Sequence, residues 1–115
     1  MLLNLSNHPS TKWTNEQRKA AIQQYGSIED MPFPQIPPEA TSDDVRILAE
    51  EYYIKIRQLD PTAVHLMGEM TFTFALVTKL KAIGINCIAS TTNRFVQEKD
   101  GKKIVQFQFI QFRDY

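Results

Sequence analysis

Residues 64–73 read VHLMGEMTFT, and this stretch decides how the rest of the chain is interpreted. An apolar segment of strand length, residues 63–67, stops at Gly68-Glu69, and an apolar segment of helix length follows at once. Continuous apolar character is typical of a strand that is buried on both faces of a parallel sheet. The stretch therefore predicts a tight strand-to-helix turn. In open α/β sheets such turns lie where ligands bind.

Strand-like and helix-like segments alternate along the first 89 residues. The expected strands are residues 2–5, 27–33, 63–67 and 85–89. The expected helices are residues 14–25, 42–59 and 71–83. A capping box of Thr14 with Gln17 starts the first helix, Ser42 caps the second, and Thr71 caps the third. Prolines restrict the second strand to a sheet edge and make residues 34–41 a stiff loop.

The last quarter of the chain predicts a loop followed by a hairpin. The polar segment STTNR, residues 90–94, is interpreted as a loop. Two strand-like segments, residues 95–99 and 102–112, then flank Asp100-Gly101, which is a strong signal for a two-residue hairpin turn. Strict alternation along the last strand would place Phe107 and Phe109 on one face and Phe112 on the other.

This order of elements predicts a single α/β domain over residues 1–115. We expect a three-layer, Rossmann-like fold with a mainly parallel sheet, because right-handed crossovers between parallel strands restrict the topology. The expected strand order is 2-1-3-4, with the C-terminal antiparallel hairpin added beyond strand four. The strand order then reverses between strands one and three, which is where ligands bind in such sheets.

Composition excludes several classes of protein. The chain has 13 Lys and Arg against 13 Asp and Glu, so its formal net charge is zero and binding to duplex DNA is not expected. A local basic pocket is compatible with this balance. The single cysteine, Cys87, excludes an internal disulfide and a cysteine-based zinc site, and its apolar neighbours predict a buried thiol.

The N-terminal segment predicts no export or membrane insertion. Residues 1–10 lack a basic region and have too short an apolar run for a signal peptide. No stretch reaches the length of about 20 apolar residues that a membrane span needs. We therefore expect a cytoplasmic protein that does not bind membranes.

Three polar segments follow strands one, three and four, and a parallel sheet would bring them to the same edge. The candidate residues in these segments are Ser6, Asn7, His8, Gly68, Glu69, Thr71, Ser90, Thr91, Thr92 and Arg94. The hydroxyls and the guanidinium of the third segment are groups that recognise phosphate. The free amides at the start of the third helix would add an anion site.

Each of these residues also has an ordinary structural explanation. His8 fits a general acid or base, because histidine titrates near neutrality, and it equally fits a solvated loop residue. Glu69 fits a ligand to a ribose hydroxyl, and it equally fits an acid that the helix dipole stabilises. Ser90 to Arg94 could also form an exposed polar turn.

Two further residues are interpreted as structural, with a functional alternative for each. His65 lies inside an apolar strand, which favours a hydrogen-bonded core histidine over a ligand. Trp13 precedes the first helix, where a packing staple is the common role, and stacking on a nucleobase is the alternative. The chain lacks G-x-G-x-x-G, Walker, G-x-S-x-G and H-E-x-x-H motifs, so we expect no cofactor and no metal site.

The segments LLNLSNHPS, VHLMGEMTFTFALVTKL and GINCIASTTNR, with a final strand that ends in FRDY, resemble small stand-alone CRISPR-associated Rossmann-fold (CARF-like) proteins. The resemblance covers most of the chain and rests on the layout and on the three polar segments. Such proteins bind cyclic oligoadenylates across a homodimer, and those of the ring-nuclease type cleave them without metal. The resemblance implies that the ribose 2′-hydroxyl acts as nucleophile and leaves a cyclic phosphate.

Carried onto this chain, the resemblance implies catalytic roles for His8, Glu69 and Arg94, with the other candidates binding the ligand. A competing hypothesis is a non-enzymatic homodimeric interaction or ligand-sensing module, in which the apolar third helix and the last strand form a protein interface, because an open hairpin edge can pair with another chain. A third is an enzyme that uses His8 and Glu69 on a small molecule. A pocket that joins the three polar segments would favour ligand binding, whereas a flat edge with these segments apart would favour the interaction module.

Overall fold

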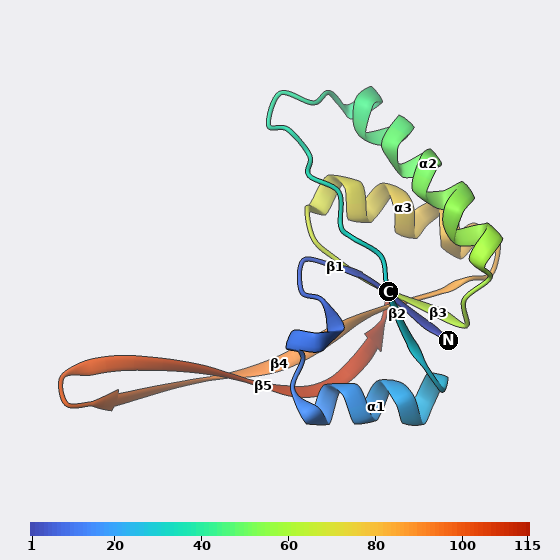
Figure 1. Ribbon diagram of the computed structural model, residues 1–115. Coiled ribbons are helices and arrows are strands. Elements are labelled where there is room, and N and C mark those ends of the chain that lie inside the picture. Colours follow the sequence, from blue (N-terminus) through green and yellow to red (C-terminus); the bar gives the residue numbers. More distant parts are fainter.

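The computed structural model describes residues 1–115 and contains one five-stranded sheet and three α-helices (Figure 1). The strands are β1 (Leu2–Ser6), β2 (Ile28–Asp30), β3 (Ala63–Met67), β4 (Asn86–Lys99) and β5 (Lys102–Asp114). The helices are α1 (Asn15–Tyr25), α2 (Ser42–Leu59) and α3 (Met70–Ala82), with a short 3₁₀ helix, η1, at Ser10–Lys12. None of the helices combines the length and apolarity that crossing a bilayer needs.

The sheet has the order β2-β1-β3-β4-β5, which confirms the expected topology. Strand β1 pairs in parallel with β2 and β3, and β3 pairs in parallel with β4. Strand β5 closes the sheet as an antiparallel partner of β4. The fold is thus a mainly parallel, Rossmann-like α/β fold with a C-terminal antiparallel hairpin. The order reverses between β1 and β3, so these two carboxyl ends form the expected ligand-binding edge.

Helices cover both faces of the sheet, α2 and α3 on one side and α1 on the other (Figure 1). Alternation along β1 divides its side chains between the two faces. Leu3 and Leu5 belong to the core under α2 and α3, whereas Leu2 packs with Trp13 on the α1 side. The same alternation places the polar side chains of Asn4 and Ser6 on the α1 side, where they are buried.

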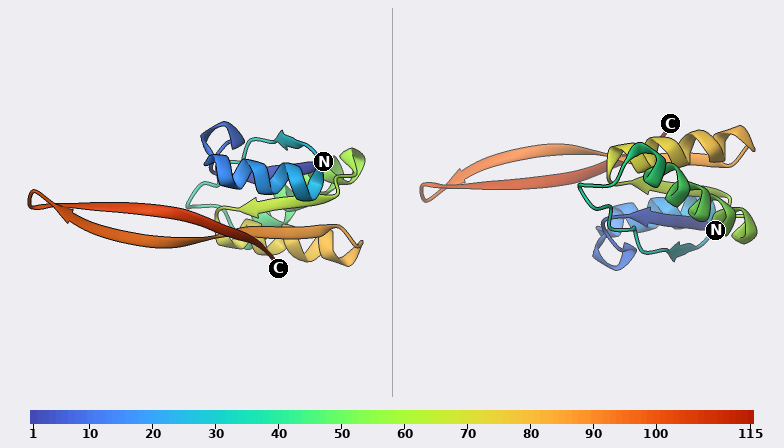
Figure 2. Two further views of the ribbon diagram at one scale, coloured as in Figure 1. Left: turned by 90° about the horizontal axis from the view of Figure 1, so that it is seen from below. Right: turned by 90° about the horizontal axis from the view of Figure 1, so that it is seen from above.

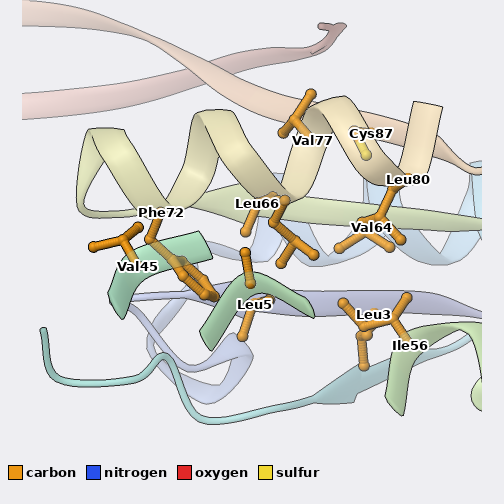
Figure 3. Packing of buried hydrophobic residues seen from close by; sticks show 12 residues of the cluster. Leu3, Leu5, Val45, Ile56, Val64, Leu66, Phe72, Val77, Leu80 and Cys87 are labelled. Atoms are coloured by element: carbon orange, nitrogen blue, oxygen red, sulfur yellow. The ribbon is translucent and has the colours of Figure 1, made fainter. Parts of the chain in front are cut away.

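The main core lies between the sheet and the helices α2 and α3 (Figure 3). Its labelled members come from five elements and include Val45, Ile56, Val64, Leu66, Phe72, Val77, Leu80 and Cys87. Phe72 is fully buried and makes edge contacts with the rings of Phe33 and Tyr52. The α1 side of the sheet has the smaller apolar cluster, which leaves room for a polar site there.

The helix starts differ in detail from the expectations. Thr14 accepts the predicted hydrogen bond from the backbone amide of Gln17, but the return bond from the Gln17 side chain that a capping box needs is not formed. Helix α2 spans the expected residues, but its cap is Thr41 and not Ser42: Thr41 and Asp44 exchange the two hydrogen bonds of a capping box. The chain leaves α2 at Asp60, which adopts a left-handed conformation at φ 49°.

The prediction of a loop at residues 90–94 was wrong. Strand β4 runs without interruption from Asn86 to Lys99, because β5 supplies it with a partner strand along most of this length. The pairing skips Ile110, since Gln111 lies opposite Thr91 and Phe109 lies opposite Thr92. This bulge shifts the alternation by one residue, so Phe112 joins Phe109 on the α1 side, with their ring centroids 5.0 Å apart.

The far part of the β4–β5 hairpin, residues 93–108, extends away from the body as a twisted two-stranded ribbon (Figure 2). We refer to residues 93–108 as the arm. The predicted turn at its tip is confirmed, since Asp100 and Gly101 have φ angles of 54° and 74°, as a two-residue hairpin turn of this type requires. The arm makes the molecule 49 Å long.

Candidate functional site

A cleft of about 580 Å³ opens on the α1 side of the sheet, at the carboxyl ends of β1 and β3 and beside the base of the arm. We call it the α1-face cleft. Six of its lining residues come from the three predicted polar segments: Ser6, Asn7, His8, Gly68, Ser90 and Thr92. Sequence reasoning did not assign the others to a common site: Lys12, Trp13, Thr14, Gln17, His65, Met67, Phe107 and Phe109. The predicted convergence of the three segments is therefore present in the structure.

Four candidate residues lie outside this cleft. Thr91 points to the opposite face of β4, and its hydroxyl donates to the carbonyl of Gln111 at 3.1 Å. Arg94 shares a face of β4 with Thr92 but lies further out, exposed at the base of the arm. Glu69 and Thr71 lie at the start of α3 and border other clefts.

Glu69, and not Thr71, is the cap of α3. Its carboxylate accepts hydrogen bonds from the backbone amides of Thr71 and Phe72, both at 2.9 Å, and from the Thr71 hydroxyl at 2.7 Å. These bonds, of which the Thr71 hydroxyl contributes most, lower the pKa of Glu69. The expected anion site at the start of α3 was wrong, because the carboxylate already occupies the amides that an anion would need.

Gly68 is required by packing against the proline-rich segment. A Cβ atom on Gly68 would lie 2.2 Å from the Cζ atom of Phe33, whose ring therefore covers the turn after β3. The same ring packs edge-on against Phe72 in the main core. Phe33 stands between Pro32 and Pro34, and the prolines restrict the backbone that holds this ring in place. This contact explains why the turn after β3 begins with glycine.

A buried hydrogen-bond network centred on Asn4 holds the loop after β1. The Asn4 side-chain amide donates to the His8 carbonyl at 2.9 Å and to the Asp30 carboxylate at 2.8 Å. The Trp13 indole N–H donates to the same His8 carbonyl at 3.2 Å. The backbone of His8 is thus fixed from the inside, while its side chain lines the cleft and is exposed to solvent.

His65 completes this network. The sequence indicated a hydrogen-bonded core histidine but did not indicate that His65 also lines the cleft. The side-chain N–H groups of Asn4 point at two acceptors, the His8 carbonyl and the Asp30 carboxylate. The side-chain oxygen of Asn4 must therefore face His65, and it lies 2.9 Å from the Nδ1 atom of His65. His65 therefore carries its proton on Nδ1, which leaves Nε2 as an acceptor, and Nε2 has no partner. Burial, reinforced by the nearby His8, lowers the pKa of His65 to about 4 and keeps the ring neutral at pH 7. An unpartnered buried acceptor at the wall of a cleft is unusual.

Trp13 is a packing residue that also lines the cleft. It is 7% exposed and its ring packs edge-on against His65 at 5.0 Å, which is a structural role. The ring also lines the α1-face cleft, together with Phe107 and Phe109. Aromatic side chains from two separate parts of the chain thus line the cleft, and flat aromatic surfaces are what nucleobases stack on.

A second cleft, of about 740 Å³, lies between the loop after β1 and the proline-rich segment. It is larger, but two acids, Asp30 and Glu69, line it. Burial alone would raise the pKa of Asp30, but hydrogen bonds from Asn4 and from the backbone and hydroxyl of Ser10 outweigh burial and lower it. No carboxylate lines the α1-face cleft, so an anionic ligand meets less repulsion there.

Two other reactive groups take no part in the cleft. Cys87 is buried in the main core, as predicted, and burial raises the pKa of its thiol to about 11, which makes it a poor nucleophile. No group of three or more His, Cys, Asp or Glu side chains lies close enough together to hold a metal ion.

The sheet order and the position of the α1-face cleft define a small Rossmann-like α/β protein with a candidate ligand site at the carboxyl edge of its parallel strands. Residues 1–113 match the family model described as the uncharacterized protein MJ1673 family, and the chain belongs to this family. No curated protein and no solved structure matches the chain.

Proposed function

We propose that the protein binds a nucleotide in the α1-face cleft. The observation that carries this proposal is the convergence of three polar segments on a cleft that has aromatic walls and no carboxylate. Hydroxyl, imidazole and ammonium groups suit phosphate, and aromatic rings suit a base. The location agrees with the general rule for open α/β sheets, since it lies beside the point at which the strand order reverses.

The lining residues divide into groups with different chemistry. Lys12, together with the hydroxyls of Ser90 and Thr92, supports a phosphate site. Lys12 takes the role that the sequence analysis gave to Arg94, which lies outside the cleft. Trp13 and Phe107 are placed to contact a base or a ribose, and the acceptor of His65 suits an N–H or O–H donor of the ligand.

The resemblance to CARF-like proteins supports a cyclic oligoadenylate as the nucleotide and metal-independent cleavage as the reaction. In that reaction the 2′-hydroxyl oxygen attacks the adjacent phosphorus and the P–O5′ bond breaks, which leaves a 2′,3′-cyclic phosphate. The hydroxyl proton leaves to a base and the departing 5′-oxygen takes up a proton. His8, with its backbone fixed and its imidazole in the cleft, is our candidate for this proton transfer.

The test is incubation of the purified protein with cyclic tetra-adenylate and cyclic hexa-adenylate in the presence of a chelator. Chromatography scores cleavage and a thermal shift scores binding. We expect the natural protein to bind and cleave these ligands. Lys12→Ala should weaken the binding, and His8→Ala should abolish the cleavage. Lys19→Ala is the matched control, because Lys19 is exposed on α1 away from the cleft.

Two outcomes would revise the proposal. Binding without cleavage would leave a sensor or a ligand sink, with the cleft retained as the site. No binding of either ligand or of linear adenosine nucleotides would contradict the proposal as a whole.

A second candidate function, a non-enzymatic homodimeric interaction module, is favoured by one specific observation. The arm exposes several large apolar side chains, which is typical of a surface that binds protein. The third hypothesis, a joint role of His8 and Glu69, loses its support, because the two side chains border different clefts.

A further inference from the structure

The arm presents apolar side chains to solvent between its base and its charged tip. Phe107 is 63% exposed, Val96 is 50% exposed and Val105 is 40% exposed. Beyond its base, where Phe107 borders the α1-face cleft, the arm extends clear of the body (Figure 2). A two-stranded ribbon is only marginally stable in water by itself. A covering surface is therefore expected for the arm.

The two faces of the arm differ in character. Residues directly opposite each other in an antiparallel pair share a face, and the register pairs Arg94 with Phe107, Val96 with Val105, and Glu98 with Lys103. We call this set of six residues the Val96 face. The other face carries amides between its apolar residues, including Asn93, Gln97, Gln106 and Gln108. The Val96 face is therefore the more continuous apolar surface, with charged residues at both ends.

The charges on the Val96 face complement those on a reversed copy of the same face. Along β4 the order is Arg94, Val96, Glu98, with a cation and an acid at equal distances from the central valine. A two-fold axis that crosses the arm at Val96 and Val105 would reverse this order in a second copy. Each Arg94 would then lie over a Glu98, and each Lys103 would lie over a Phe107 ring, which is a favourable cation–π pair.

We propose that the Val96 face packs against the Val96 face of a second copy of the chain, with the two arms antiparallel. Such an isologous contact closes on itself, so it produces a dimer and not an open filament. The formal net charge of zero means that two copies do not repel each other at long range. The mixture of both charge signs on this face fits a second copy better than it fits a polyanion or an anionic lipid surface.

This pairing also connects the arm with the α1-face cleft. Phe107 belongs both to the Val96 face and to the cleft lining. In the paired arrangement the partner subunit's Lys103 lies at the mouth of the cleft and adds a positive charge there. This consequence, unlike the pairing itself, rests on the proposed function.

The experiment measures the oligomeric state of the full chain without ligand by sedimentation equilibrium. We expect a dimer for the natural sequence. Arg94→Glu and Glu98→Arg each place like charges together twice per dimer, and each should weaken the dimer by about tenfold. The double variant Arg94→Glu with Glu98→Arg restores the opposite pairs and should restore the dimer. Lys102→Glu, a charge reversal on the other face of the arm, should leave the dimer unchanged.

A monomer at all accessible concentrations would overturn the proposal. A dimer that both single charge reversals leave intact would also overturn it, because the contact would then lie elsewhere. Circular dichroism of each variant confirms folding, and Val105→Thr provides a second, uncharged disruption at the two-fold axis that should also weaken the dimer. Since no ligand is present, failure of nucleotide binding does not affect these results.

Discussion

His65 and Asn4 illustrate how much of the site depends on single buried polar residues. The sequence analysis treated residues 2–5 as an apolar strand and His65 as a core residue, and both do lie in the interior. Their hydrogen bond to each other joins positions 61 residues apart, which no local pattern reveals. An asparagine within an apolar strand was the one signal that could have indicated the network. The loop that carries His8 is positioned by this pair.

The lowered pKa of His65 predicts that stability falls on mild acidification. Well above pH 6.5 the imidazole is neutral in both the folded and the unfolded protein, so its titration does not change the free energy of unfolding. Between pH 6.5 and about 4 the unfolded chain binds a proton that the folded protein does not, so the free energy of unfolding decreases as the pH falls. We expect this group to contribute a loss of about 2 kcal/mol between pH 7.5 and pH 5.

Urea unfolding at several pH values checks this expectation. His65→Leu should be less stable than the natural sequence at pH 7.5, because it loses the bond to Asn4, but its stability should change less towards pH 5. Equal pH dependence of the two proteins would show that His65 is not the responsible group.

Gly68 gives a second prediction at the level of one residue. An added Cβ would collide with the Phe33 ring at 2.2 Å, so Gly68→Ala should destabilise the fold by about 1–3 kcal/mol. The cost should be much smaller in a Phe33→Ala background, because the ring is then absent. A double-mutant cycle measured by denaturant unfolding tests this coupling. Additive effects of the two substitutions would contradict the contact.

At the scale of elements, the expected helices and strands are present, but the segments expected as two strands, residues 85–89 and 95–99, form one continuous strand. Helix α2 and strand β3 were predictable because their periodic apolar patterns are long and clear. Residues 90–94 were assigned to a loop because hydroxyl and amide side chains dominate them locally. Their strand conformation depends on pairing with β5, a partner later in the chain, so local composition could not predict it. The cap of α3 was misassigned for a related reason, since Glu and Thr compete for the same amides.

The capping role of Glu69 predicts a separation between stability and function. Glu69→Ala removes the acceptor for two backbone amides and should lower stability by about 1 kcal/mol. It should leave ligand binding unchanged, because Glu69 does not line the α1-face cleft. Thermal unfolding and a ligand titration on the same variant measure both effects. Loss of binding or cleavage in a folded variant would return Glu69 to the candidate site.

At the scale of the whole molecule, the topology was the most predictable property. The alternation of strands and helices, together with right-handed crossovers, was sufficient for the order β2-β1-β3-β4. The convergence of three polar segments followed from that order. The arm was only partly predictable, because its turn is encoded locally whereas its extension beyond the body is a property of three-dimensional packing. The aromatic wall that Phe107 and Phe109 give the cleft was missed for the same reason.

Nucleotide binding in the α1-face cleft is the central claim, and Trp13 offers a direct reporter of it. Trp13 is the single tryptophan of the chain and lines the cleft. Titration with cyclic tetra-adenylate should produce a saturable change in its fluorescence. Thr92→Ala should weaken the binding, whereas Thr91→Ala, on the opposite face of the same strand, should not. No change in fluorescence up to about 1 mM ligand, or equal effects of the two substitutions, would contradict the claim.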